Sequence, residues 1–135
     1  MNQRGFATLE VILMVMVIGI LASIAIPRFG DITTRANTAR IQADLSTIDT
    51  AIALYYMKKG NYPDKNDSLN VLIDYLQNTS LKPPSGKAYI KGENGEPTPK
   101  DISGNYGFTE VTLSNSNKVI QAALGNKTAD NFYVP

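Results

Sequence analysis

The chain of 135 residues contains no cysteine, no histidine and no tryptophan. The lack of cysteine excludes disulfides, and the lack of both cysteine and histidine removes thiolate nucleophiles, imidazole bases and the common zinc ligands. The chain also has no large excess of positive or negative charge, since 13 Lys and Arg residues nearly balance 12 Asp and Glu residues. Nucleic acid therefore has little electrostatic support as the main partner. No phosphate-binding loop or nucleophile-elbow motif occurs, and we predict no enzyme activity and no cofactor.

Hydrophobic residues are concentrated near the amino terminus. They occupy 17 of the 21 positions in residues 6–26, where Glu10 is the only charged residue. As a helix, this segment spans about 31 Å, close to the hydrocarbon thickness of a bilayer. We predict a retained membrane-spanning helix, with Arg4 on the cytoplasmic side. The alternative is a cleaved secretory signal peptide, because small residues near position 23 imitate a cleavage site.

Glu10 is the informative residue of this segment. A carboxylate inside lipid costs about 2.5 to 3.5 kcal/mol or more unless it finds a partner. One interpretation places Glu10 at the interface, where its side chain reaches the headgroups. The other pairs Glu10 with a positive group on a second copy of the chain.

Small residues and a proline mark the rest of the apolar segment. Gly19 and Ser23 lie four positions apart, a spacing that permits close helix packing in lipid. Pro27 lacks an amide hydrogen and clashes with the carbonyl of Ser23, which predicts a kink strengthened by the nearby Gly30. Whether this kink is a hinge used in assembly or only the end of a membrane helix stays open.

The sequence RGFATLE that starts at Arg4, followed by the apolar run to Pro27, closely resembles the class III signal of type IV pilins and pseudopilins. Gly19 and Pro27 also match positions of that family. The resemblance covers the chain to about Tyr62. It departs from many bacterial pilins in having no disulfide-bounded loop near the carboxy terminus.

This resemblance implies a processing event and an assembly role. A prepilin peptidase would cut between Gly5 and Phe6 and methylate the new amino terminus of Phe6. Glu10 would then neutralise the amine of a neighbouring subunit. The implied partners are other copies of the chain in a helical homopolymer, the peptidase, an inner-membrane assembly platform and a cytoplasmic ATPase. The implied location is the cytoplasmic membrane as a single-pass protein, and afterwards an extracellular or periplasmic filament.

Apolar residues in the next segment recur at helical spacing. Ile41, Leu45, Ile48, Ile52 and Tyr55 are four, three, four and three positions apart and predict an amphipathic helix with one buried stripe.

The charged residues between the members of this stripe suit a second face, turned to solvent or to other subunits. Lys58 and Lys59 before Gly60 indicate the end of this helix. We therefore divide the chain into a leader (residues 1–5), a membrane or filament-core helix (6–26), its amphipathic continuation (27–60) and a globular head (61–135).

The head carries weaker patterns. Leu69, Leu72, Ile73 and Leu76 predict a short helix. Residues 88–91, 106–113 and 118–124 predict strands, the tail at 132–134 predicts a last strand, and residues 92–104 predict a loop. The expected fold is α+β and pilin-like, with one long amino-terminal helix kinked near Pro27 and packed on an antiparallel sheet of three or four strands.

Two weaker site hypotheses fall on the loops of the head. Asp101, Ser103 and Asn105 carry oxygen ligands, but these are ordinary turn residues without the spacing of a calcium-binding loop, so we predict no metal site. Several lysines give the loops a basic character, yet few aromatic residues accompany them, and DNA binding is unsupported.

The sequence thus predicts a structural filament subunit, either a pilin or a major pseudopilin of a type II secretion or competence system. The competing hypothesis is a membrane-tethered adhesin or DNA-binding minor pilin that does not polymerise.

Overall fold

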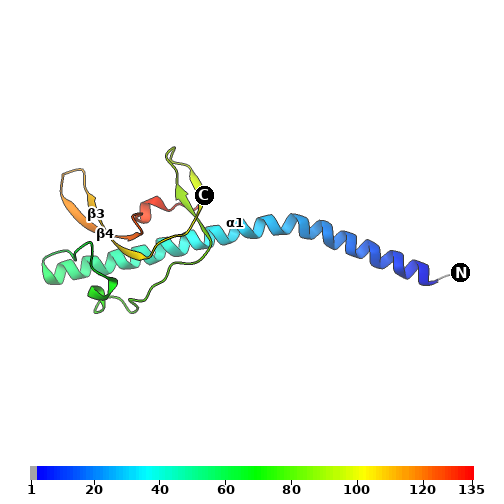
Figure 1. Ribbon diagram of the computed structural model, residues 1–135, viewed down its shortest axis with the longest axis horizontal. Helices are drawn as coiled ribbons and strands as arrows, with labels where there is room; N and C mark the ends of the chain where they lie inside the picture. Colours follow the sequence, from blue (N-terminus) through cyan, green and yellow to red (C-terminus); the bar gives the residue numbers. More distant parts are fainter. Residues whose placement is uncertain (1–2) are drawn as a thin grey trace. The chain divides into compact units, whose positions relative to one another are not determined.

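A computed structural model describes residues 3–26 and 29–135 (Figure 1). The chain forms two compact units, Met1–Thr33 and Thr34–Pro135, which are described separately. A single helix, α1 (Gln3–Lys59), contributes residues to both. The kink expected near Pro27 falls outside the described residues and stays a prediction.

Helix α1 ends where the sequence signals predicted. Lys58 and Lys59 occupy its last turn, where cationic side chains interact favourably with the helix dipole. Gly60 follows with φ of 78° and donates its N–H to the carbonyl oxygen of Tyr56 at 2.8 Å. Glycine adopts this left-handed conformation without a Cβ clash, which stops the helix and starts the chain of the head.

The apolar stripe of α1 forms the centre of the head. Ile41, Leu45 and Ile48 are fully buried and Ile52 is 2% exposed, as their helical spacing predicted. They join a single hydrophobic core with residues from the strands and from the carboxy-terminal tail. Burial of each such side chain contributes roughly 1.5 to 3 kcal/mol, so this stripe attaches the head to its helix.

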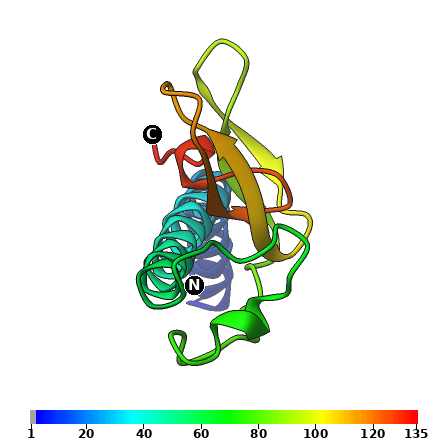
Figure 2. The same ribbon diagram turned by 90° about the vertical axis from the view of Figure 1, so that its left-hand side faces the viewer.

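Four antiparallel strands cover this stripe: β1 (Lys87–Lys91), β2 (Pro97–Asp101), β3 (Tyr106–Thr112) and β4 (Lys118–Leu124). They form two hairpins, β1–β2 and β3–β4, in place of one continuous sheet. Both hairpins lie along the same side of α1 (Figures 1 and 2). Ala88 and Ile90 of β1 are buried in the core and alternate with the exposed Lys87 and Lys91 and the half-buried Tyr89, as expected for a strand with one buried face.

Strand β2 lies inside the segment that was predicted to be a loop. Its two prolines, Pro97 and Pro99, have no N–H for a second neighbour, and β2 accordingly pairs with β1 alone. The tail contributes an isolated bridge between Phe132 and Ile90 instead of the full last strand expected.

The short helix of the head is smaller than its pattern predicted. Only a 3-10 turn, η1 (Leu69–Leu72), forms, although Leu69, Leu72 and Leu76 are buried as expected. A second 3-10 turn, η2 (Ala129–Asn131), leads into the tail. Ile73, the residue after η1, is 65% exposed, although its pattern grouped it with the three buried leucines.

Candidate functional site

The apolar segment of α1 carries its hydrophobic side chains on the outside. Its most apolar window of 18 residues has a mean hydropathy of 2.7, and none of that window is buried. Phe6 is 75% exposed, and the large apolar side chains from Leu9 to Ile26 are all more than half exposed. Exposed apolar surface on this scale marks a region that is covered by lipid or by another protein. By length and composition, α1 is long and apolar enough to cross a membrane.

Glu10 lies on an open apolar face of this segment with Leu13, Met14, Val17 and Ile18, which follow it at the spacing of one helix face. Among the residues that the structure describes, none donates a hydrogen bond to the Glu10 carboxylate or forms an ion pair with it.

The other small and polar residues of the segment leave its surface open. Gly5 and Gly19 both lie in α1, and a Cβ atom built at either position has no neighbour within 4 Å. The hydroxyls of Thr8 and Ser23 donate to the carbonyl oxygens of Arg4 and Ile20, at 2.9 and 2.7 Å. Because the helix itself satisfies these hydroxyls, they add little cost in lipid.

The structure places Gly5, Phe6, Glu10 and Gly19 on one exposed helix, which begins at Gln3, within the expected leader. Their roles in processing and assembly stay predictions. Pro27 lies outside the described residues.

Sequence reasoning missed a set of polar contacts that fixes the head to α1. Thr38 is fully buried, accepts the Tyr89 N–H at 2.8 Å and donates its hydroxyl hydrogen to the Thr34 carbonyl oxygen at 2.7 Å. The Asn37 amide donates to the carbonyl oxygens of Ser85 and Lys87, at 3.0 and 3.1 Å. These side chains hold the first strand and its preceding loop in register on the helix.

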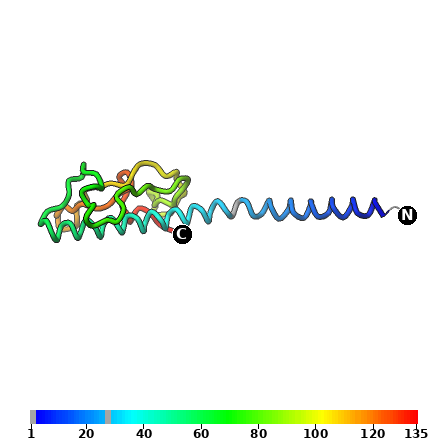
Figure 3. Tube along the Cα trace, turned by 90° about the horizontal axis from the view of Figure 1, so that it is seen from below, coloured from blue at the N-terminus to red at the C-terminus, as the bar shows by residue number. Residues whose placement is uncertain are grey.

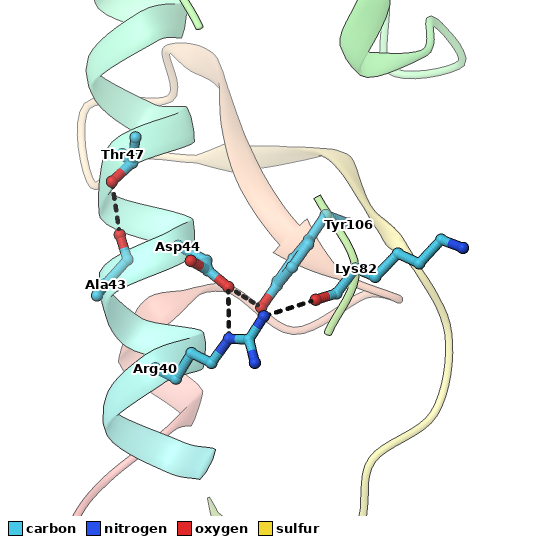
Figure 4. A network of polar contacts seen from close by, with 6 residues as sticks. All are labelled: Arg40, Ala43, Asp44, Thr47, Lys82 and Tyr106. Atoms are coloured by element: carbon cyan, nitrogen blue, oxygen red, sulfur yellow. Dashed lines mark hydrogen bonds and ion pairs between the residues drawn. The ribbon is translucent and has the colours of Figure 1, made fainter. Parts of the chain in front are cut away.

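Asp44 makes a second such contact with the β3 strand (Figure 4). The Tyr106 hydroxyl donates to the Asp44 carboxylate at 2.7 Å, and the Arg40 side chain lies 3.8 Å from the same oxygen. Arg40 also donates to the carbonyl oxygen of Lys82 at 3.5 Å. Burial, followed by the hydrogen bond to Asp44 and its negative charge, raises the pKa of Tyr106 well above its usual value.

Asp49 contacts β4, the second strand of the same hairpin. Its carboxylate accepts the Ala122 N–H at 2.6 Å. Burial raises the pKa of Asp49, with a further contribution from Asp130, although the Ala122 hydrogen bond acts in the opposite direction. Asp44 and Asp49 were expected on a polar face turned to solvent or to other subunits; both are instead half-buried against the strands of the same head.

The loop with the candidate oxygen ligands has an ordinary structural role. The Ile102 N–H donates to the carbonyl oxygen of Gly86, and the Gly125 N–H donates to that of Asn105. A Cβ atom on Gly104, which has φ of 91°, would lie 3.3 Å from the Cα of Gly125. Glycine at position 104 therefore permits close packing of two loops. Within the described part of the chain, no three His, Cys, Asp or Glu side chains gather into a metal-binding group.

Comparison with known proteins finds relatives in two kinds of filament system. Residues 29–110 match the family model described as type II secretion system protein G. The chain is 28% identical over 104 residues to the type II secretion system core protein G of Escherichia coli, covering 77% of this chain and 69% of that protein. It is 30% identical over 121 residues to the type IV major pilin protein PilE1 of Neisseria gonorrhoeae, covering 88% of this chain and 58% of that pilin. No solved structure matches the chain significantly.

Proposed function

The chain belongs to the type II secretion system protein G family, and from this we propose that it is a structural subunit that polymerises through α1 into a filament resembling a type IV pilus. The observation that carries the proposal is the exposed apolar segment at residues 6–26, whose one carboxylate, Glu10, has no hydrogen-bond or ion-pair partner among the residues that the structure describes.

Processing would create a positive partner for Glu10. We propose that a prepilin peptidase cuts after Gly5 and that the new amino terminus, on Phe6, is methylated. Residues 1–5 are then the leader and residues 6–26 the membrane helix before assembly. The amine of Phe6 in one subunit would pair with the Glu10 carboxylate of a neighbour. This pairing would lower the free energy needed to bury both charges in a water-free helix bundle.

Assembly exchanges one apolar environment for another. Before assembly, residues 6–26 lie in the inner membrane as a single span. In the filament they pack against the same segments of other copies, where the open surface at Gly19 allows close approach. Pro27 would adapt the helix between residues 6–26 and the continuation at 27–60. The head (61–135) stays folded on that continuation, and extraction from lipid is driven by an assembly platform and a cytoplasmic ATPase.

A pseudopilin is the more specific form of this proposal. The matched family model covers residues 29–110, which include much of the head as well as part of the helix. A subunit of that class would form a periplasmic pseudopilus of a secretion system, whereas a pilin would form a filament on the cell surface. The matched family model favours this form over a non-polymerising adhesin or DNA-binding minor pilin.

Intact-mass spectrometry on membranes and on sheared filaments from the native host tests this proposal. A mature chain that begins at methylated Phe6 and is enriched in the filament fraction is the expected result. Full-length chain in the membranes with none in filaments, or cleavage near Ser23, would refute it. Location of the filament, outside the cell or within the periplasm, then separates the pilin from the pseudopilin.

A further inference from the structure

An apolar groove of about 450 Å³ opens on the head where α1 approaches its Lys59 end. One wall comes from α1 and the other from the β3–β4 hairpin and the residue that follows β3. The main apolar residues of the two walls are Ile52, Ala53, Tyr56, Met57, Leu113, Val119 and Ile120. Met57 is 81% exposed, Tyr56 is 42% exposed and Leu113 is 43% exposed. Three large apolar side chains exposed around one groove indicate a binding surface.

The chemistry of the groove suits an aromatic side chain with a polar end. Gln121 and Asp49 place an amide and a carboxylate in the otherwise apolar lining. The thioether of Met57 makes favourable contacts with aromatic rings. A tyrosine combines a large apolar ring with a hydroxyl that needs a hydrogen-bond partner when it is buried.

The same head presents such a tyrosine on its carboxy-terminal tail. Tyr133 is 56% exposed, while the preceding Phe132 is 3% exposed and bridges to Ile90. The Gln42 side chain donates to the Phe132 carbonyl oxygen at 2.8 Å, and the Tyr133 N–H donates to the Tyr89 carbonyl oxygen at 3.4 Å. The backbone that carries Tyr133 is therefore fixed, and little conformational entropy is lost when its ring binds a partner.

The tail and the groove belong to opposite ends of the head. The tail is attached to α1 near Arg35, whose guanidinium donates to the Pro135 carbonyl oxygen, and near Gln42. The groove includes Met57, 22 residues after Arg35 on the same helix, or about 33 Å along its axis. Figures 1 and 3 show the carboxy terminus beside the earlier part of α1 in the head, away from the Lys59 end. Tyr133 therefore does not reach the groove of its own chain.

We propose that Tyr133 of one subunit docks into the groove of a second copy, so that its ring contacts Met57 and its hydroxyl bonds to Gln121 or Asp49. This inference rests on the proposed filament function. The contact joins the tail of one copy to the groove of another. Because these two surfaces differ, the contact can repeat from copy to copy without closing into a ring when the copies stack head to tail. Stacked heads would be related by a translation of about 33 Å along α1, the spacing that brings the tail of one copy to the groove of the next.

Cysteine cross-linking tests the contact directly, because the natural chain has no cysteine. The test pair carries Tyr133→Cys and Met57→Cys in one chain. The matched control carries Tyr133→Cys and Ile73→Cys, since Ile73 is also well exposed, at 65%, but does not line the groove. Filaments are sheared, treated with a short thiol cross-linker and separated on a denaturing gel. We expect a ladder of dimers and higher oligomers from the test pair, with dimers about tenfold or more above the control pair, because only apposed thiols react at a high effective concentration.

A charge exchange gives a second measurement that does not depend on cross-linking. Met57→Asp alone should reduce filament yield, because it adds a second carboxylate beside Asp49 in the groove. Tyr133→Lys alone should also reduce it, because the ring that contacts Met57 is lost. Combined in one chain, the two changes place opposite charges together and should restore the yield. Normal filaments without the ladder, or a double variant no better than its single parents, would overturn the docking proposal and leave the filament function intact. Failure of the natural chain to form any filament would overturn the filament function itself.

Discussion

Replacing Tyr106 with phenylalanine removes one hydroxyl from the contact that joins β3 to α1. That hydroxyl donates to the Asp44 carboxylate at 2.7 Å, and Tyr106 is 7% exposed. A hydrogen bond to a charged group contributes about 1.5 to 3 kcal/mol. Arg40 remains 3.8 Å from the Asp44 carboxylate, and the Asp44 side chain is 20% exposed, so both Arg40 and water compensate part of the loss. We therefore expect Tyr106→Phe to lower the free energy of unfolding of the head by about 1.5 kcal/mol, the lower end of that range.

The pH dependence of this loss has a definite sign. Burial and Asp44 raise the pKa of Tyr106 in the folded head above the value of 10.0 that it has when unfolded. The stabilisation by a group whose folded pKa is raised is complete below the unfolded pKa and is lost as the pH rises toward the folded pKa. The difference in stability between the natural chain and Tyr106→Phe should therefore be largest below pH 10 and shrink above it.

Calorimetry of the full chain in detergent measures both quantities. For a head of this size the expected loss lowers the unfolding temperature by about 6 to 12 °C. Tyr133→Phe is the matched control, since Tyr133 is exposed, and its unfolding temperature should stay within about 2 °C of the natural value. An unfolding temperature of Tyr106→Phe equal to that of the control, or a difference that grows above pH 10, would refute the reasoning.

Three further changes test other parts of the molecule. Glu10→Ala should give a processed, membrane-inserted chain that forms no filaments. The control, Glu110→Ala, removes an exposed carboxylate of the head and should form filaments normally. Filament yield after shearing measures both, and a normal yield from Glu10→Ala would contradict the pairing of Glu10. Leu45→Ala should lower the free energy of unfolding of the head by about 2 to 5 kcal/mol, measured by calorimetry, because Leu45 is fully buried. Asp49→Asn keeps an oxygen acceptor for the Ala122 N–H but removes the titration. Because burial raises the folded pKa of Asp49, the natural head should gain stability relative to this variant as the pH falls through that folded pKa toward 3.8, and a loss of relative stability would contradict the assignment.

The parts of the fold that the sequence predicted are those set by local patterns. The stripe of Ile41, Leu45, Ile48 and Ile52 follows from helical periodicity, and the end of α1 follows from the lysines before Gly60. Strands β1, β3 and β4 were also placed from their own residues, to within one or two positions at their ends.

The parts that the sequence did not predict depend on contacts between distant segments. Strand β2 contains Pro97 and Pro99 and is a strand only because β1 lies beside it. Asp44 and Asp49 belong to a helix face of ordinary polar composition, and only the positions of Tyr106 and Ala122, 62 and 73 residues away, make them buried acceptors.

By itself, the sequence determined the apolar helix, its single carboxylate at Glu10 and the amphipathic continuation that anchors a head, because these depend on composition and on a period of 3.6 residues. The tertiary structure decided which side chains of the head meet. It divided four strands into two hairpins, turned Asp44 and Asp49 into partners for the strands, and separated Tyr133 from the groove at Met57. These arrangements depend on pairings between residues far apart in the chain, whose relative positions no local pattern encodes.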